Sequence, residues 1–166
     1  MSRPSLLKAA TSKCRLLVAL PFLALLLWAH CHYRLALVVG ESMRPGLKTG
    51  DLLLIDKRAY ANSDPRRGDV VLARHEHDLI IKRVVGLPGE EVALHLGHLQ
   101  INGVPLAEEQ KMEPGRLEIL PGRLFPGRFA LLGDNRAVGP FQIVHAVVKK
   151  DQVIGKVVGT LCWWKS

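Results

Sequence analysis

One lysine in the middle of the chain has neighbours that suggest chemistry. Successive side chains of a β-strand point to opposite faces, so Lys82 would share one face with Ile80 and Val84. Burial among such apolar side chains lowers the pKa of a lysine, and a neutral lysine can act as the base that activates a serine hydroxyl. The alternative is an edge-strand lysine that keeps its ammonium group in water, which is a common arrangement.

The spacing of other reactive side chains gives weaker evidence for a chemical site. His75 and His77 would share one strand face, but zinc needs a third and usually a fourth ligand, so we interpret them as polar hairpin residues. Glu90 and Glu91 are adjacent, and adjacent strand residues face opposite sides. The sequence has no nucleotide-binding or zinc-finger motif. We therefore expect no metal and no cofactor.

The elements that must position Lys82 are short strands. After Arg34, short apolar runs alternate with Gly, Pro and Asp, which predicts a mostly β domain of one compact unit. Asn102-Gly103 is typical of a two-residue hairpin turn, and the polar segment Glu108–Pro126 is expected to be a surface excursion. The predicted strands are Leu35–Val39, Leu52–Asp56, Asp69–Arg74, Leu79–Val85, Glu91–Leu96, Leu99–Ile101, Arg128–Leu132 and Val153–Val158.

An apolar segment precedes this domain. Leu16–Ala29 carries no charge, and its extension to Tyr33 gives 18 residues, close to the minimum for a transmembrane helix. The cations before it favour a cytoplasmic N-terminus. A cleaved signal peptide and a buried core helix are the alternatives. The sequence thus predicts a basic cytoplasmic N-terminus (1–15), one transmembrane anchor (16–33) and an extracytoplasmic domain (35–166).

The net charge of +8 is concentrated near this segment. Residues 1–34 contain five Lys or Arg and no acidic residue, whereas the other 132 residues contain 18 Lys or Arg against 15 Asp or Glu. The cations of the later part are scattered without interleaved aromatic residues, which excludes a nucleic-acid-binding surface. The charge is therefore interpreted as a topology signal, with a lipid bilayer as partner. The three cysteines do not form a disulfide framework.

Five segments together resemble the type I signal peptidase family, the membrane-bound Ser/Lys proteases. The most specific are Ser42-Met43-Arg44-Pro45 and Lys82-Arg83-x-x-Gly86-x-x-Gly89. Gly50-Asp51, Arg67-Gly68-Asp69 and Gly133-Asp134-Asn135-Arg136 complete the series. The resemblance covers about residues 35–160 and is to the compact Gram-positive and mitochondrial forms. It implies a signal-peptidase-like β domain behind one N-terminal transmembrane helix.

The resemblance implies a role for each matching residue. Ser42 would be the nucleophile, Lys82 the general base, and the Ser42 N–H an oxyanion donor, with Gly40 where some relatives carry a serine hydroxyl. Asp134 would pair with Arg83, with Gly133 and Asn135 as further structural support; a turn aspartate and an unrelated surface arginine are the alternative. Residues 37–41 and 78–81 would grip an extended signal peptide with small residues at positions −1 and −3. The substrate-binding candidates, which could equally be core residues, are Val38, Val39, Glu41, Met43, Ile80 and Ile81.

The chain departs from the family in its last motif. The family continues with Ser-x-Asp-Ser-Arg, whereas Arg136 is followed here by Ala137-Val138-Gly139-Pro140-Phe141-Gln142-Ile143. A gapped alternative matches Arg136-x-x-Gly139-Pro140 to the family's Arg-x-x-Gly-Pro. In both cases the serine that would hydrogen-bond the catalytic lysine is missing. Thr160 or Ser63 could supply a substitute hydroxyl.

These features predict a single-pass membrane serine endopeptidase that removes signal peptides from translocated preproteins. A bacterial plasma membrane and a mitochondrial inner membrane both fit the charge pattern. A specialised peptidase with one client and a membrane-anchored assembly factor with a decayed site are the alternatives, and the anchor disfavours cytosolic self-cleaving relatives. The sequence does not give the oligomeric state.

Overall fold

The computed structural model describes residues 5–108, 112–139 and 142–161, with the backbone alone for residues 5–18. The chain divides into two compact units, Met1–Tyr33 and Arg34–Ser166. Helix α1 (Ser5–His32) forms the first unit and contains Pro21. Leu20, Phe22 and most other large apolar side chains described on this helix are exposed.

Within the part of the chain that the structure describes, no helix is both long enough and apolar enough to cross a membrane. Helix α1 includes most of the predicted anchor, residues 16–33, but begins well before it. The transmembrane anchor therefore stays a prediction.

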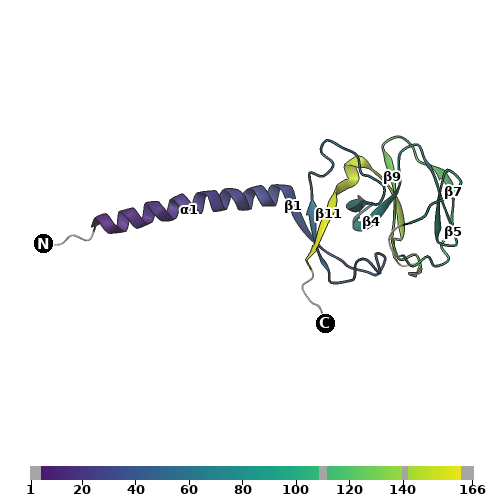
Figure 1. The fold of residues 1–166 in the computed structure, drawn as a ribbon, viewed down its shortest axis with the longest axis horizontal. Coiled ribbons are helices and arrows are strands. Elements are labelled where there is room, and N and C mark those ends of the chain that lie inside the picture. The colour runs from purple at the N-terminus through teal and green to yellow at the C-terminus, as the bar shows by residue number, and fades with distance from the viewer. Residues whose placement is uncertain (1–4, 109–111, 140–141, 162–166) are drawn as a thin grey trace. The chain divides into compact units, whose positions relative to one another are not determined.

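The second unit is built from two sheets (Figure 1). The larger sheet has the strand order β1-β2-β11-β3-β4-β9-β10, and its pairings from β2 to β10 are antiparallel. A single-turn 3₁₀ helix, Lys150–Gln152, lies between β10 and β11. The strands of this sheet are β1 (Tyr33–Leu37), β2 (Leu52–Asp56), β3 (Val70–His75), β4 (Asp78–Gly86), β9 (Arg128–Leu132), β10 (His145–Lys149) and β11 (Val153–Leu161).

The smaller sheet has four strands in the order β7-β6-β5-β8. It lies beside β9 of the larger sheet (Figure 1). Asn102 and Gly103 both have positive φ angles, 52° and 77°, as a type I′ hairpin turn between β6 and β7 requires. Its strands are β5 (Glu91–His95), β6 (His98–Ile101), β7 (Val104–Pro105) and β8 (Ile119–Arg123).

The core explains how β4 presents Lys82. Ile80 and Val84 are 6% and 0% exposed and pack in one apolar cluster with Phe129 and Leu131, on the face that Lys82 shares. Ile81 points the other way and packs against a second cluster that contains Leu53 and Ile55. The predicted alternation along this strand is therefore confirmed. A third cluster joins the two sheets through residues such as Leu94, Leu99 and Leu132.

The predicted strands are all present, with ends displaced by a few residues. Strands β8 and β10 were not predicted, and β7 was implied only as the second arm of the Asn102-Gly103 hairpin. Strand β8 lies inside the expected excursion Glu108–Pro126, so that expectation is wrong over Ile119–Arg123. Its Pro121 and Gly122 are typical of turns, yet the strand is held at the sheet edge by pairing with β5. Strand β10 has a period-2 signal, because Ala146 and Val148 are buried between exposed neighbours.

Candidate active site

The site begins with a contact between a strand lysine and a loop serine. Lys82 Nζ, from β4, donates a hydrogen bond to Ser42 Oγ at 2.7 Å and a second to the Ile81 carbonyl at 3.1 Å. Lys82 and Ser42 are only 4% and 8% exposed. The loop that carries Ser42 is closed at its base by two backbone hydrogen bonds, from Val38 to Asp51 and from Gly50 to Val38. An amine and a hydroxyl are therefore held at hydrogen-bond distance with little access to water.

Burial determines the protonation of the lysine. It lowers the pKa of Lys82 from 10.5 to about 8, because a charged ammonium is poorly solvated there, while the nearby Asp134 carboxylate raises the pKa in opposition. The residue opposite Lys82 on β3 is Val71, which is fully buried and offers the ammonium no polar partner. A neutral amine is thus accessible close to neutral pH, and a neutral amine can accept the serine proton.

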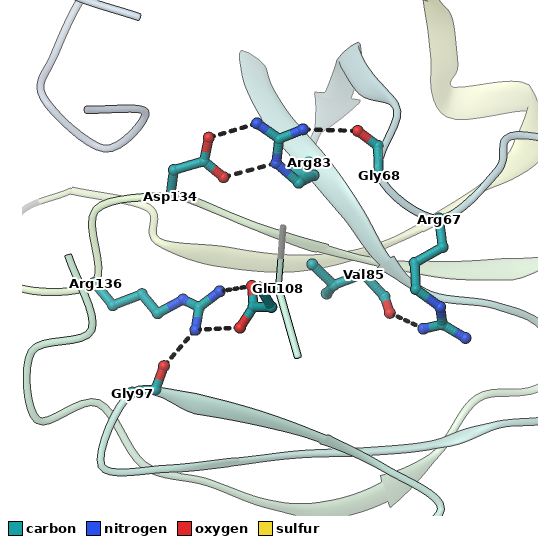
Figure 2. A network of polar contacts seen from close by, with 8 residues as sticks. All are labelled: Arg67, Gly68, Arg83, Val85, Gly97, Glu108, Asp134 and Arg136. Carbon is teal, nitrogen blue, oxygen red and sulfur yellow. Dashed lines mark hydrogen bonds and ion pairs between the residues drawn. The ribbon is translucent and has the colours of Figure 1, made fainter. Parts of the chain in front are cut away.

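Asp134 is compensated by an arginine on the same strand as Lys82 (Figure 2). Arg83 donates to both carboxylate oxygens of Asp134, at 2.8 and 2.6 Å, and a third hydrogen bond runs from Arg83 to the Gly68 carbonyl. The Asp134 side chain is 3% exposed. A bidentate pair of this kind fixes the orientation of the guanidinium and of the carboxylate, and the arginine offsets much of the negative charge of the carboxylate. Asp134 consequently favours a protonated Lys82 less than an unpaired carboxylate would.

Asn135 fixes the peptide group that precedes the serine. Its Nδ2 donates to the Glu41 carbonyl at 3.1 Å, and its backbone N–H donates to the Ser42 carbonyl at 3.0 Å. The peptide bond is planar, so holding the Glu41 carbonyl also fixes the direction of the Ser42 N–H on the opposite side. No hydrogen bond within the described residues uses this N–H, which leaves it available to an oxyanion.

Gln142 holds the next peptide group upstream, and the sequence analysis did not identify it. Its Oε1 accepts a hydrogen bond from the Glu41 N–H at 3.1 Å. The same oxygen would lie 3.4 Å from a Cβ placed on Gly40, so the carboxamide fills the space beside that glycine. The only signal in the sequence is that Gln142 is polar and lies in the segment where the family's Ser-x-Asp-Ser-Arg motif is missing. Pro140 and Phe141, just before it, lie outside the described residues.

The motif continues into a second buried ion pair (Figure 2). Arg136 and Glu108 pair through both carboxylate oxygens, with side chains 1% and 5% exposed, and Arg136 also donates to the Gly97 carbonyl. Backbone hydrogen bonds join Glu113 to Asp134 and Arg136. Sequence reasoning gave Arg136 no partner, because Glu108 is far away in the chain. This pair ties the segment after β7 to the loop that supports the serine.

The other predicted site residues differ in their burial. Val38, Met43 and Ile80 are buried core residues, whereas Val39 is 83% exposed, and Ile81 is partly buried. Glu41 accepts hydrogen bonds from Thr49 and Arg44. Both lower the pKa of its carboxyl, and the hydrogen bond from Thr49 has the larger effect.

Neither suggested substitute hydroxyl lies among the hydrogen-bond partners of Lys82 in the described chain. Ser63 donates to the Ala59 carbonyl instead, and no hydrogen bond joins Thr160 to Lys82. Over the same residues, no group of three His, Cys, Asp or Glu side chains is placed to hold a metal ion.

Comparisons with known proteins place the chain among peptidases. Residues 11–164 match the family described as "Signal peptidase, peptidase S26". A "Probable signal peptidase I-2" of Synechocystis sp. is 32% identical over 72% of this chain and 58% of its own length. A "Signal peptidase I" of Leptolyngbya laminosa is 34% identical over 73% and 64%. One of Bacillus caldolyticus is 34% identical over 72% and 74%. The chain thus spans about three fifths of the length of the first two relatives.

The lowered pKa of Lys82 makes stability depend on pH in a defined direction. Between pH 8 and pH 10.5 the unfolded lysine keeps its proton while the folded one loses it, so the free energy of unfolding rises with pH. We predict that the stability difference between Lys82→Met and wild type shifts in favour of wild type by on the order of 3 kcal/mol across this interval. Urea unfolding followed by circular dichroism measures it. A pH-independent difference would show that folding does not lower the pKa of Lys82.

Gly133 tests the close approach of the motif to the serine loop. A Cβ on Gly133 would lie 2.4 Å from the Ser42 carbonyl oxygen, so Gly133→Ala must displace that loop. We expect a loss of about 1–3 kcal/mol in the free energy of unfolding, as for other overpacked sites. Gly139→Ala is the matched control, because a Cβ there meets no atom of the described residues within 4 Å. Equal stabilities of the two variants would contradict the predicted steric constraint.

Proposed function

The chain belongs to the signal peptidase family S26, and we propose that it removes signal peptides from exported preproteins with a Ser42–Lys82 pair. The observation that carries this proposal is the 2.7 Å contact between Lys82 Nζ and Ser42 Oγ in a buried setting. A serine hydroxyl alone is a weak nucleophile and needs an adjacent base. Family membership and this contact together favour peptide-bond hydrolysis.

The proposed reaction uses one proton path. Neutral Lys82 accepts the proton of Ser42 as Oγ attacks the scissile carbonyl, and the resulting ammonium then protonates the leaving amine. The acyl group remains on Ser42 as an ester. A water molecule loses its proton to Lys82 and attacks the ester, and the ammonium returns that proton to Ser42. The Ser42 N–H, directed by the Asn135 contact to Glu41, is the proposed donor to the oxyanion in both steps.

An extended substrate fits the free edge of β4. Strand β3 pairs with one edge of β4, and strand β9 pairs with the opposite edge only from Arg83 to Gly86. Along Asp78–Ile81 that opposite edge therefore has no strand partner among the described residues. A peptide added there would form main-chain hydrogen bonds and reach Ser42 and Lys82. The buried side chains of Val38, Met43 and Ile80 would leave shallow pockets beside the scissile bond. Such pockets suit the small −1 and −3 residues that the family resemblance implies.

The N-terminal segment is the proposed membrane anchor. The side chains described on helix α1 are mostly exposed and apolar, and five cations with no acidic residue occur in residues 1–34. This pattern favours a cytoplasmic N-terminus and a catalytic domain outside. Insertion of residues 16–33 into a bacterial plasma membrane, or a mitochondrial inner membrane, would place the domain where translocated preproteins emerge.

Cleavage of a preprotein tests the proposed activity. We expect the purified full chain to cut a preprotein with alanine at −1 and −3, and Ser42→Ala and Lys82→Met to lose about a thousandfold or more in kcat/KM. Ser63→Ala and Lys48→Met are matched controls on exposed residues and should retain activity. Equal cleavage by all variants would exclude the Ser/Lys mechanism. Binding of the precursor without cleavage by wild type would favour the assembly-factor alternative.

Gln142 should affect catalysis through the position of Glu41. Gln142→Met keeps the side-chain length but leaves the Glu41 N–H without an acceptor, and we expect kcat to fall about five- to tenfold with little change in KM. Gln142→Glu restores an acceptor and should recover part of this loss. Both variants should match wild type in thermal unfolding. A wild-type kcat for Gln142→Met would show that this hydrogen bond does not position the nucleophile.

A further inference from the structure

One cavity has neither Ser42 nor Lys82 among its lining residues. It has a volume of about 480 Å³ and is lined by residues of strands β9 and β10 of the larger sheet and of strands β5 and β8 of the smaller one. Its walls are mostly apolar and include Val92, Leu94 and Ala130. Two large apolar side chains at its margin are exposed, Leu120 by 86% and Phe125 by 73%. Mostly apolar cavities of a few hundred Å³ are typical of small-ligand sites.

Basic side chains lie at this cavity and beside it. Arg128 on β9 and Lys149 on β10 are directly opposite each other, on the same sheet face as Ala130 and Val147. Arg123, on β8, also lines the cavity, and none of the described residues that line it is acidic. Like charges directly opposite each other on neighbouring strands repel, so the pair is unfavourable unless an anion lies nearby.

A basic hollow continues from Arg128. This second hollow shares Arg128 with the apolar cavity and is also lined by Lys149, Lys150 and Lys57, with Asp151 as its acidic member. Lys150 has an ion-pair partner in Asp64. No ion pair or side-chain hydrogen bond within the described residues engages the head groups of Arg128 and Lys149, whereas Arg83 and Arg67 are paired with carboxylates. Where the apolar cavity meets the basic hollow, Arg128 and the neighbouring Lys149 therefore have no counter-ion among the described residues.

We propose that this cavity binds an anionic amphiphile with a long acyl chain, the chain between the two sheets and the head group on Arg128 and Lys149. Apolar side chains suit a hydrocarbon chain, but they would leave the N–H and C=O groups of a bound peptide without partners. The two cations suit a carboxylate or phosphate head group through charge-assisted hydrogen bonds. A fatty acid and an anionic membrane lipid share this chemistry.

Photo-crosslinking tests the site without reference to peptidase activity. The full chain in phosphatidylcholine nanodiscs is irradiated with a long-chain fatty acid that carries a diazirine near its methyl end, and the labelled peptides are identified by mass spectrometry. We expect labels within residues 92–99, 117–132 and 143–149, which include most of the residues that line the cavity. The double variant Arg128→Gln/Lys149→Gln should be labelled several-fold less, whereas Lys48→Gln/Arg74→Gln, on exposed cations elsewhere, should match wild type.

Competitors distinguish the two sources of the ligand. Greater protection by unlabelled oleate than by phosphatidylglycerol supports a free fatty acid as ligand, and the reverse supports a membrane lipid. Equal labelling by the matching long-chain alcohol, equal labelling of the Arg128/Lys149 variant and wild type, or labels confined to helix α1 would each overturn the proposal. Preprotein cleavage by the same preparations reports separately on the peptidase function.

Discussion

The 2.7 Å contact between Lys82 Nζ and Ser42 Oγ forms only if the rest of the domain buries the lysine and holds the serine loop beside it. A lysine serves as a base only when it is neutral, and burial is what makes it neutral. Burial in turn requires a strand whose face is otherwise apolar, which Ile80 and Val84 provide. Because the Lys82 side chain is fixed in a packed strand, the loop must hold Ser42 within hydrogen-bond distance of it. The loop around Ser42 is accordingly tied down on several sides.

One short motif supplies most of those ties. Gly133 allows close approach to the Ser42 carbonyl, and Asp134 pairs with Arg83 on the lysine strand. Asn135 orients the peptide group before the serine, and Arg136 pairs with Glu108 to secure the adjoining segment. The four consecutive residues thus contact the strand of Lys82, the loop of Ser42 and the segment that adjoins them. Charges within this region are buried in pairs, which limits their influence on Lys82.

Sequence reasoning predicted the features that local pattern determines. The alternation around Lys82 and the Asn102-Gly103 turn follow from strand periodicity and from the positive φ that such a turn requires. The pattern could not show which distant residues meet. Gln142 reaches Glu41 across 101 residues, and its position in the chain looked only like a missing serine. Strand β8 was hidden because Pro121 and Gly122 carry a turn signal that edge pairing overrides. The Arg136–Glu108 pair is likewise a product of tertiary packing.

The pH dependence of kcat/KM for preprotein cleavage tests the role of Lys82 most directly, because kcat/KM reports the ionisation of the free enzyme. A neutral lysine as base requires kcat/KM to rise with pH and to level off around an apparent pKa of about 8. Arg83→Met leaves Asp134 without its partner, so the carboxylate should raise the pKa of Lys82 further. The rise of kcat/KM should then occur at higher pH. A rate that keeps rising toward the ordinary lysine pKa of 10.5, or one independent of pH between 6 and 10, would contradict a buried, neutral Lys82 as the base.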